Sequence, residues 1–276
     1  MIQKMLSVCY YTIRESMYRK TFVAFFILST ITLAFFLFVI NFDVVDGVLA
    51  GFSLFGNTVK SGKTDLFEMI AQIETIVAST LIGGGIFLSI IATASIVPNM
   101  LQKGHIDWLI SKPVPRSWLL LGRFLGAVSI VAVNMLYVIL GTFLILSTKT
   151  GVWNFNFLFA GLIIIGLFAI IYAFMTIISV TIPNSAISIF AGYIIIFISP
   201  FLLERAKIYA LASEKLLKYL LEFLYMITPR IAEISILIPK MIKGVPIDDF
   251  TPIWYSLLLG AFYFSSAVFI FQRKDF

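Results

Sequence analysis

Long runs of apolar residues alternate with short charged segments along this chain. A helix needs about 20 apolar residues to cross a hydrocarbon core of roughly 30 Å, and six runs have about that length. The pattern predicts an all-α integral membrane protein that forms one transmembrane domain over residues 1–276. We expect the six transmembrane helices at residues 21–40, 75–97, 118–147, 157–182, 185–203 and 252–271.

Charged side chains are nearly absent from these six runs. Five contain no Asp, Glu, Lys, Arg or His, and the third contains only Arg123. Arg123 is near the start of its run, where a long side chain can extend to the lipid headgroups. Ion-coupled carriers usually bind their ion at ionisable groups near the middle of the membrane. The sequence therefore predicts transport that is passive or driven by another protein.

The N-terminal segment and the segment between the second and third runs have patterns of their own. In residues 1–20, apolar residues recur at spacings of three and four, which predicts an amphipathic helix on the membrane surface. A disordered basic leader is the alternative.

Residues 98–117 are about half polar, and Gly104, Pro113 and Pro115 indicate a short helix, a turn and an extended lead-in to the third run. This segment is either an interface for a soluble partner or only a connector.

Residues 204–251 are too charged to cross a membrane, because each charge at the centre of a span costs roughly 2.5–3.5 kcal/mol. Within them, residues 216–224 and 231–238 are apolar on one side. We expect two short helices at the outer membrane surface, interrupted by Pro229 and Pro239.

Charge asymmetry predicts the orientation. If both chain ends are cytoplasmic, the inner segments hold ten Lys and Arg against three acidic residues. The outer segments then hold ten Lys and Arg against eleven acidic residues, over a longer stretch of chain. An excess of Lys and Arg is typical of the cytoplasmic side. We therefore expect a multi-pass protein of the cytoplasmic membrane, with both termini in the cytoplasm.

Composition supports this class and excludes others. Hydrophobic residues make up 61 % of the chain and charged residues 12 %, whereas a soluble domain carries roughly 25 % charged residues. With one cysteine, Cys9, and one histidine, His105, the chain has neither a disulfide framework nor a metal site built from several Cys or His ligands. Its surplus of Lys and Arg matches anionic headgroups better than nucleic acid, because no basic face interleaved with aromatic residues is present.

Familiar catalytic motifs are missing. Residues 61–64, Ser-Gly-Lys-Thr, look like the end of a phosphate-binding loop, but the glycine required at position 57 is replaced by Asn57. The sequence contains no Ser/His/Asp set, H-E-x-x-H motif or paired intramembrane carboxylates. We expect a chain that is not an enzyme and binds no cofactor of its own. A membrane-embedded enzyme with a less familiar constellation stays an alternative.

Glycines stand at two places inside the apolar runs. Gly83, Gly84 and Gly85 interrupt the second run, and Gly122 and Gly126 form a small-xxx-small pair at the start of the third. Such glycines allow helices to approach closely, or act as hinges in a moving part.

Residues 104–126 carry the most specific local signature. They include Gly-His-Ile-Asp-Trp-Leu-Ile-Ser-Lys-Pro-Val-Pro-Arg at 104–116 and Leu-Leu-Gly-Arg-Phe-Leu-Gly at 120–126. The chain ends with Phe-Gln-Arg-Lys-Asp-Phe at 271–276. With the amphipathic N-terminus, six spans and a large segment between the last two, the chain resembles the ABC-2 type permease family. It is most similar to the NosY-like permeases, which are linked to the maturation of multi-copper enzymes.

The resemblance implies the type V exporter-like permease fold, in which residues 1–20 form an interfacial elbow helix. Residues 98–117 would be a cytoplasmic coupling loop seated in a groove of an ABC ATPase subunit. Lys112, Pro113 and Arg116 would shape its return into the third span. The other loop residues implied in contact with the ATPase are Asn99, Gln102, Lys103, Gly104, His105, Asp107 and Trp108.

The resemblance also implies a function and partners. ATP hydrolysis in the separate ATPase subunit, which would bind ATP and Mg²⁺, would drive export of a substrate or mechanical action on an extracytoplasmic partner. A second permease copy, identical or related, would complete the assembly within the membrane lipids, and residues 204–251 would form the platform for the outer partner. The alternatives are an embedded enzyme, a channel or ion-coupled carrier, and a structural anchor.

Overall fold

The computed structural model describes residues 2–18, 20–38, 40–45, 48–54, 57–59, 66–102, 115–205, 215–247 and 249–274. Six helical segments in these ranges are long and apolar enough to cross a membrane. They are Lys20–Phe38, Leu66–Met100, Arg116–Thr150, Phe155–Thr181, Ser185–Leu203 and Thr251–Arg273. This confirms the prediction of a multi-pass, helical membrane protein with six spans.

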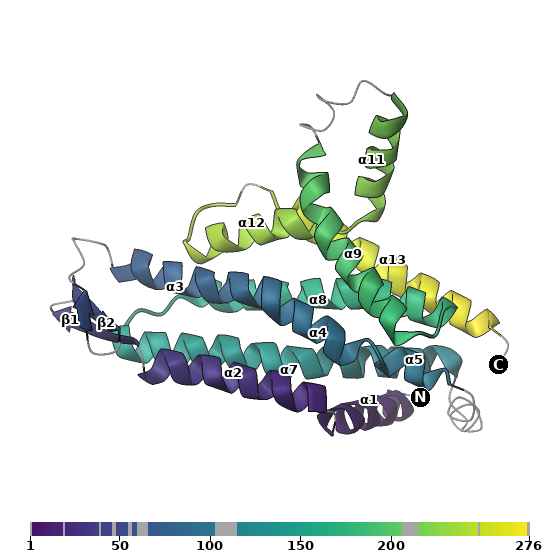
Figure 1. Cartoon of the computed structure of the whole chain (residues 1–276), viewed down its shortest axis with the longest axis horizontal. Coiled ribbons are helices and arrows are strands. Elements are labelled where there is room, and N and C mark those ends of the chain that lie inside the picture. Colours follow the sequence, from purple (N-terminus) through teal and green to yellow (C-terminus); the bar gives the residue numbers. More distant parts are fainter. Residues whose placement is uncertain are drawn as a thin grey trace.

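The helices run back and forth between two ends of a bundle (Figure 1). Helix α1 (Ile2–Met17) lies at one end, which we call the elbow end, and α13 (Thr251–Arg273) finishes there too. Helix α2 (Lys20–Phe38) runs from it to the opposite end, which we call the sheet end. Helix α7 (Arg116–Thr150) runs alongside α2, and α8 (Phe155–Thr181) returns between α7 and α13.

Helix α7 ends where a glycine is required. Gly151 follows it with a φ of 78°, the left-handed conformation that a glycine adopts without steric strain, and its N–H donates to the Ser147 carbonyl. The short connection then turns the chain back into α8, so the two helices pack as antiparallel neighbours.

The second span is longer than predicted and is not a regular α-helix. It consists of α3 (Leu66–Thr80), the π-helix η1 (Leu81–Gly85), α4 (Ile86–Thr93) and α5 (Ile96–Met100). It begins at residue 66, so the prediction that it begins at 75 and carries no charge is wrong, because Glu68 and Glu74 lie within the helical run. The predicted start is the residue that directly follows Glu74, the last acidic residue before the apolar run.

A three-stranded antiparallel sheet connects α2 to α3 and was not predicted. It contains β1 (Ile40–Val45), β2 (Val48–Leu54) and β3 (Asn57–Val59), in the order β1-β2-β3. Phe42 pairs with Phe52 in the register, and the pairing shifts after Asp43. These strands are too short to give the long apolar run by which the helices were found.

The chain leaves the bundle along α9 (Ser185–Leu203) and returns through α11 (Lys215–Ile227) and α12 (Ile231–Ile242) (Figure 1). The prediction of two short helices between the last two spans is therefore confirmed. Pro239 does not interrupt α12 as expected but lies inside it. A proline removes a single backbone donor, and this one lies close to the end of the helix.

Candidate functional site at the elbow end

The elbow end brings together segments that are far apart in the sequence. Helix α1, the end of α5, the first turn of α7 and the ends of α8 and α13 all lie there (Figure 1). Three of the predicted coupling residues, Asn99, Gln102 and Arg116, are described at this end. The others lie outside the described residues, namely Lys103, Gly104, His105, Asp107, Trp108, Lys112 and Pro113.

Helix α1 docks on α7 at the two glycines predicted as a packing pair. A Cβ atom at Gly122 would lie 2.8 Å from Val8 Cβ and 3.0 Å from the Met5 carbonyl oxygen. A Cβ atom at Gly126 would lie 2.6 Å from Thr12 Cβ. Cβ contacts below 3.0 Å are essentially never seen, so any larger residue would force the helices apart. The glycine pair therefore sets the close approach of α1 and α7.

Arg123 lies between these glycines and is buried beneath α1. Its Nη1 is 2.5 Å from Glu15 Oε2, and its guanidinium carbon is 5.3 Å from the centre of the Tyr11 ring. The Arg123 side chain is 1 % exposed, so the expectation that it extends to the headgroups is wrong. A buried charge needs a partner, and Glu15 on α1 provides one that is remote in sequence.

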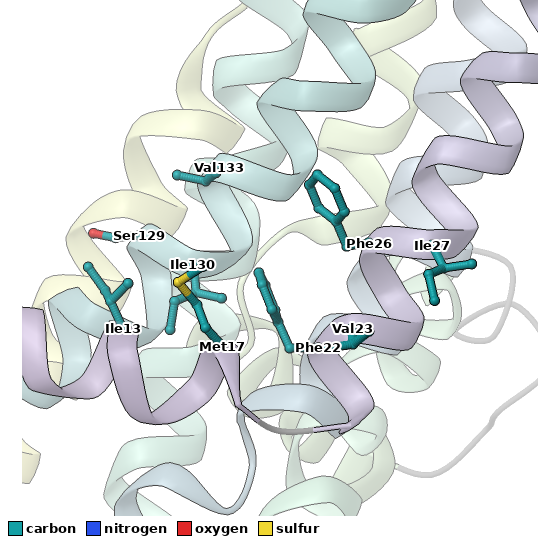
Figure 2. Close-up of a pocket in the computed structure, with 9 residues that line it drawn as sticks. All are labelled: Ile13, Met17, Phe22, Val23, Phe26, Ile27, Ser129, Ile130 and Val133. Atoms are coloured by element: carbon teal, nitrogen blue, oxygen red, sulfur yellow. The ribbon is translucent and has the colours of Figure 1, made fainter.

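Beside this contact, α1 and α2 diverge and leave a groove against α7 (Figure 2). The groove has a volume of about 330 Å³, within the roughly 300–1,000 Å³ of small-molecule pockets. Its lining residues are Ile13, Met17, Phe22, Val23, Phe26, Ile27, Ser129, Ile130 and Val133. All but one of these side chains are apolar.

Arg116 and Lys274 connect three helices at the elbow end. Arg116 Nη1, at the start of α7, donates to the Lys274 carbonyl oxygen at 2.8 Å and to that of Gln272 at 3.4 Å. Lys274 Nζ in turn donates to the carbonyls of Val180 (2.6 Å) and Thr181 (3.2 Å). These are the last residues of α8, whose carbonyls lack helical partners and attract a cation. The start of α7 is thereby fixed to the ends of α8 and α13.

The other side of the predicted loop is also anchored. In α5, Ile96, Val97 and Met100 are buried, and the helix packs against α7 and α8. Asn99 is half-buried and Gln102 is exposed, and Gln102 Nε2 donates to Asn99 Oδ1 at 3.5 Å. The segment from 103 to 114 thus begins and ends on helices that are firmly packed.

The other predicted glycine cluster lies in the middle of the second span and coincides with the π-helix η1. A Cβ atom at Gly83 or Gly84 would meet nothing within 4 Å, whereas one at Gly85 would lie 3.2 Å from Leu81 Cδ2. A smaller groove of about 180 Å³ runs between η1 and α2. Single π-turns inside helices are frequent at functional sites, so a hinge at these glycines stays a prediction.

Sequence reasoning missed a buried carboxylate at the sheet end. Glu74 in α3 is 1 % exposed, and its Oε2 accepts a hydrogen bond from Asn154 Nδ2 at 2.6 Å. The same amide donates to the Ile242 carbonyl at 2.9 Å. Asn154 thereby joins α3, the start of α8 and the end of α12. The available signal was that the apolar run continues on both sides of Glu74.

Comparison with known protein families gives no match, and comparison with curated proteins gives none either. Among the described residues, no three His, Cys, Asp or Glu side chains lie close enough together to hold a metal ion.

Proposed function

We propose that this chain is the membrane-spanning permease subunit of an ABC-2 type transporter. In this proposal a separate ABC ATPase subunit binds and hydrolyses ATP, and the chain converts its motion into substrate export or mechanical action on an extracytoplasmic partner. Two copies, identical or related, would form the assembly in the cytoplasmic membrane, with the elbow end in the cytoplasm.

The observation that carries the proposal is the anchoring on both sides of the segment between α5 and α7. A loop that transmits force to membrane helices must be attached to well-packed helices at both of its ends. Before the loop, α5 is packed on α7 and α8, and after it Arg116 bonds to the chain at the end of α13. Helix α1 is locked to the same part of α7 through Gly122, Gly126 and the ion pair of Arg123. A push on the loop would therefore move several helices together.

Glu74 is the one observation that favours an ion-coupled carrier instead. Ionisable residues buried in a span commonly mark ion pathways. Glu74 is, however, bonded to Asn154, which immediately precedes the first residue of α8. That position is at the end of the span rather than near its middle, where a coupling ion is usually bound. The bond to Ile242 also shows Asn154 acting as a connection between helices.

Co-purification tests the proposal directly. The tagged full-length chain is isolated from its native membrane, its stoichiometric partners are identified, and ATP hydrolysis is measured. The test variant carries Gly104→Pro and Asp107→Lys in the predicted loop. The control carries Asp249→Lys, the same charge reversal in the exposed connection between α12 and α13. We expect an ATPase subunit with the wild type and the control, and its loss from the loop variant.

Two results would oppose the proposal. If the chain purifies without an ATPase and with no associated ATP hydrolysis, the transporter-subunit function is wrong. If Glu74→Gln abolishes ion-gradient-driven uptake by the reconstituted chain alone, the carrier alternative replaces it.

A further inference from the structure

The groove at the corner of α1 and α2 is lined by side chains from α1, α2 and α7 (Figure 2). Five of its lining side chains are between 40 % and 62 % exposed, and these are Met17, Val23, Phe26, Ile27 and Val133. They lie on helix faces that are left exposed in the described part of the chain. Since α2 and α7 are both long and apolar enough to cross a membrane, we expect the mouth of the groove to face the bilayer.

The chemistry of the lining selects an apolar occupant. Among the described residues that line the groove, Ser129 is the only polar one, and its side chain already bonds with that of Cys9. Apolar cavities do not hold water, because a buried water needs two to four polar partners. In contact with a bilayer, such a groove is filled by a hydrocarbon chain.

Two basic residues lie next to the groove, where α1 ends and α2 begins. Arg14 lies in the last turn of α1, Lys20 is the first residue of α2, and both are exposed. The acidic residue next to Arg14 in the sequence, Glu15, is paired with Arg123. Basic residues at a membrane surface attract anionic headgroups, by about 1 kcal/mol each.

We propose that this groove binds one acyl chain of an anionic phospholipid, with the headgroup phosphate against Arg14 and Lys20. A second copy of the chain is a poorer occupant, because a twofold interface places the same patch of both copies together. Arg14 and Lys20 of one copy would then face the same two basic residues of the other copy. The inference rests on the membrane location of the helices and does not require the ATPase proposed above.

Native mass spectrometry of the full-length protein tests this proposal. The protein is purified in mild detergent, stripped of lipid, and incubated with phosphatidylglycerol or with phosphatidylcholine of the same acyl chains. We expect a retained phosphatidylglycerol and little phosphatidylcholine. Val133→Trp fills the groove and should abolish retention. Leu258→Trp is the matched control, because Leu258 is a 71 % exposed residue of α13 that does not line the groove.

Charge variants test the headgroup. Arg14→Gln and Lys20→Gln should each weaken phosphatidylglycerol binding about fivefold, the factor that corresponds to about 1 kcal/mol per basic residue. Lys218→Gln removes an exposed charge from α11 and should change little. If Val133→Trp unfolds the protein, Ile27→Trp fills the groove from the facing helix.

The proposal is overturned if a folded groove-filling variant retains phosphatidylglycerol as the wild type does, or if Leu258→Trp loses it equally. Equal retention of phosphatidylcholine overturns the assignment to anionic lipid. A change of oligomeric state in the groove variants assigns the groove to a subunit interface instead. Co-purification of an ATPase is scored separately, so failure here leaves the proposed function standing.

Discussion

The Arg123 guanidinium in α7 lies 2.5 Å from the Glu15 carboxylate in α1, although the two residues are 108 positions apart in the chain. This ion pair is on the inner face of the elbow helix, where Arg123 is almost completely buried. Helix α1 is amphipathic and was expected to lie on the membrane surface, and its two charged residues with described side chains, Arg14 and Glu15, differ in their surroundings. Glu15 fixes the helix to the bundle, whereas Arg14 stays exposed.

Removing Glu15 should destabilise the protein strongly. Glu15→Gln leaves Arg123 buried without a counter-charge, and breaking one side of a buried pair costs about 3–5 kcal/mol. Replacing both, with Glu15→Gln and Arg123→Gln, should restore part of that loss because no uncompensated charge is left. Thermal unfolding of the detergent-solubilised protein measures both effects. The exposed Glu222→Gln is the control, and equal melting temperatures for Glu15→Gln and the wild type would contradict the prediction.

Substitution of Gly126 should separate α1 from α7. A methyl group there would lie 2.6 Å from Thr12 Cβ, so Gly126→Ala forces a shift of one helix. Gly166 in α8 offers a matched control, because a Cβ atom there would meet nothing within 4 Å. Gly166→Ala should be neutral or stabilising by about 0.5–1 kcal/mol through helix propensity. Limited proteolysis of the N-terminus measures the difference, and equal cleavage of the two variants would refute it.

Features that depend on the local spacing of apolar residues could be predicted from the sequence. Six spans and the amphipathic N-terminal helix follow from the spacing of apolar residues, and the structure contains them. Gly122 and Gly126 were recognisable because a four-residue spacing places two small residues on one helix face.

Pairings between distant residues could not be predicted in this way. Glu15 and Arg123, or Glu74 and Asn154, are partners only because the helices pack as they do. One sequence contains no signal that selects a partner 80 or 108 residues away.

The strands at residues 40–59 were missed for another reason, since short extended segments leave no long apolar run. Of the residues predicted to contact an ATPase, Asn99, Gln102 and Arg116 lie at the elbow end, and the contact itself stays a prediction.

Asn154 should be essential for the position of α12. Asn154→Ala removes the hydrogen bonds to the Glu74 carboxylate and to the Ile242 carbonyl. Hydrogen bonds to charged groups contribute about 1.5–3 kcal/mol, so α12 should open more often than in the wild type. Hydrogen–deuterium exchange measures this as faster exchange near residue 242. Asn156→Ala, two residues along the chain, is the control, and protection of α12 that is unchanged in Asn154→Ala would contradict the assignment.

The single cysteine provides a reporter of elbow docking. Burial against α7 raises the pKa of the Cys9 thiol, and the hydrogen bond with Ser129 offsets this only in part. A raised pKa favours the protonated thiol, and because the thiolate is the nucleophile, Cys9 should react with maleimide more slowly than an exposed cysteine at pH 8. Its rate should continue to rise at pH values where an exposed thiol has already levelled off.

A matched reference for this measurement is available on the same helix. Tyr10 is 67 % exposed, so Tyr10→Cys in a Cys9→Ala background gives the reactivity of an unprotected thiol on α1. Gly126→Ala should accelerate labelling of Cys9 towards that reference, because it pushes α1 away from α7, while Gly166→Ala should leave the rate unchanged. Labelling of wild-type Cys9 as fast as the Tyr10→Cys reference, with the same pH dependence, would mean that α1 is not held against α7 in solution.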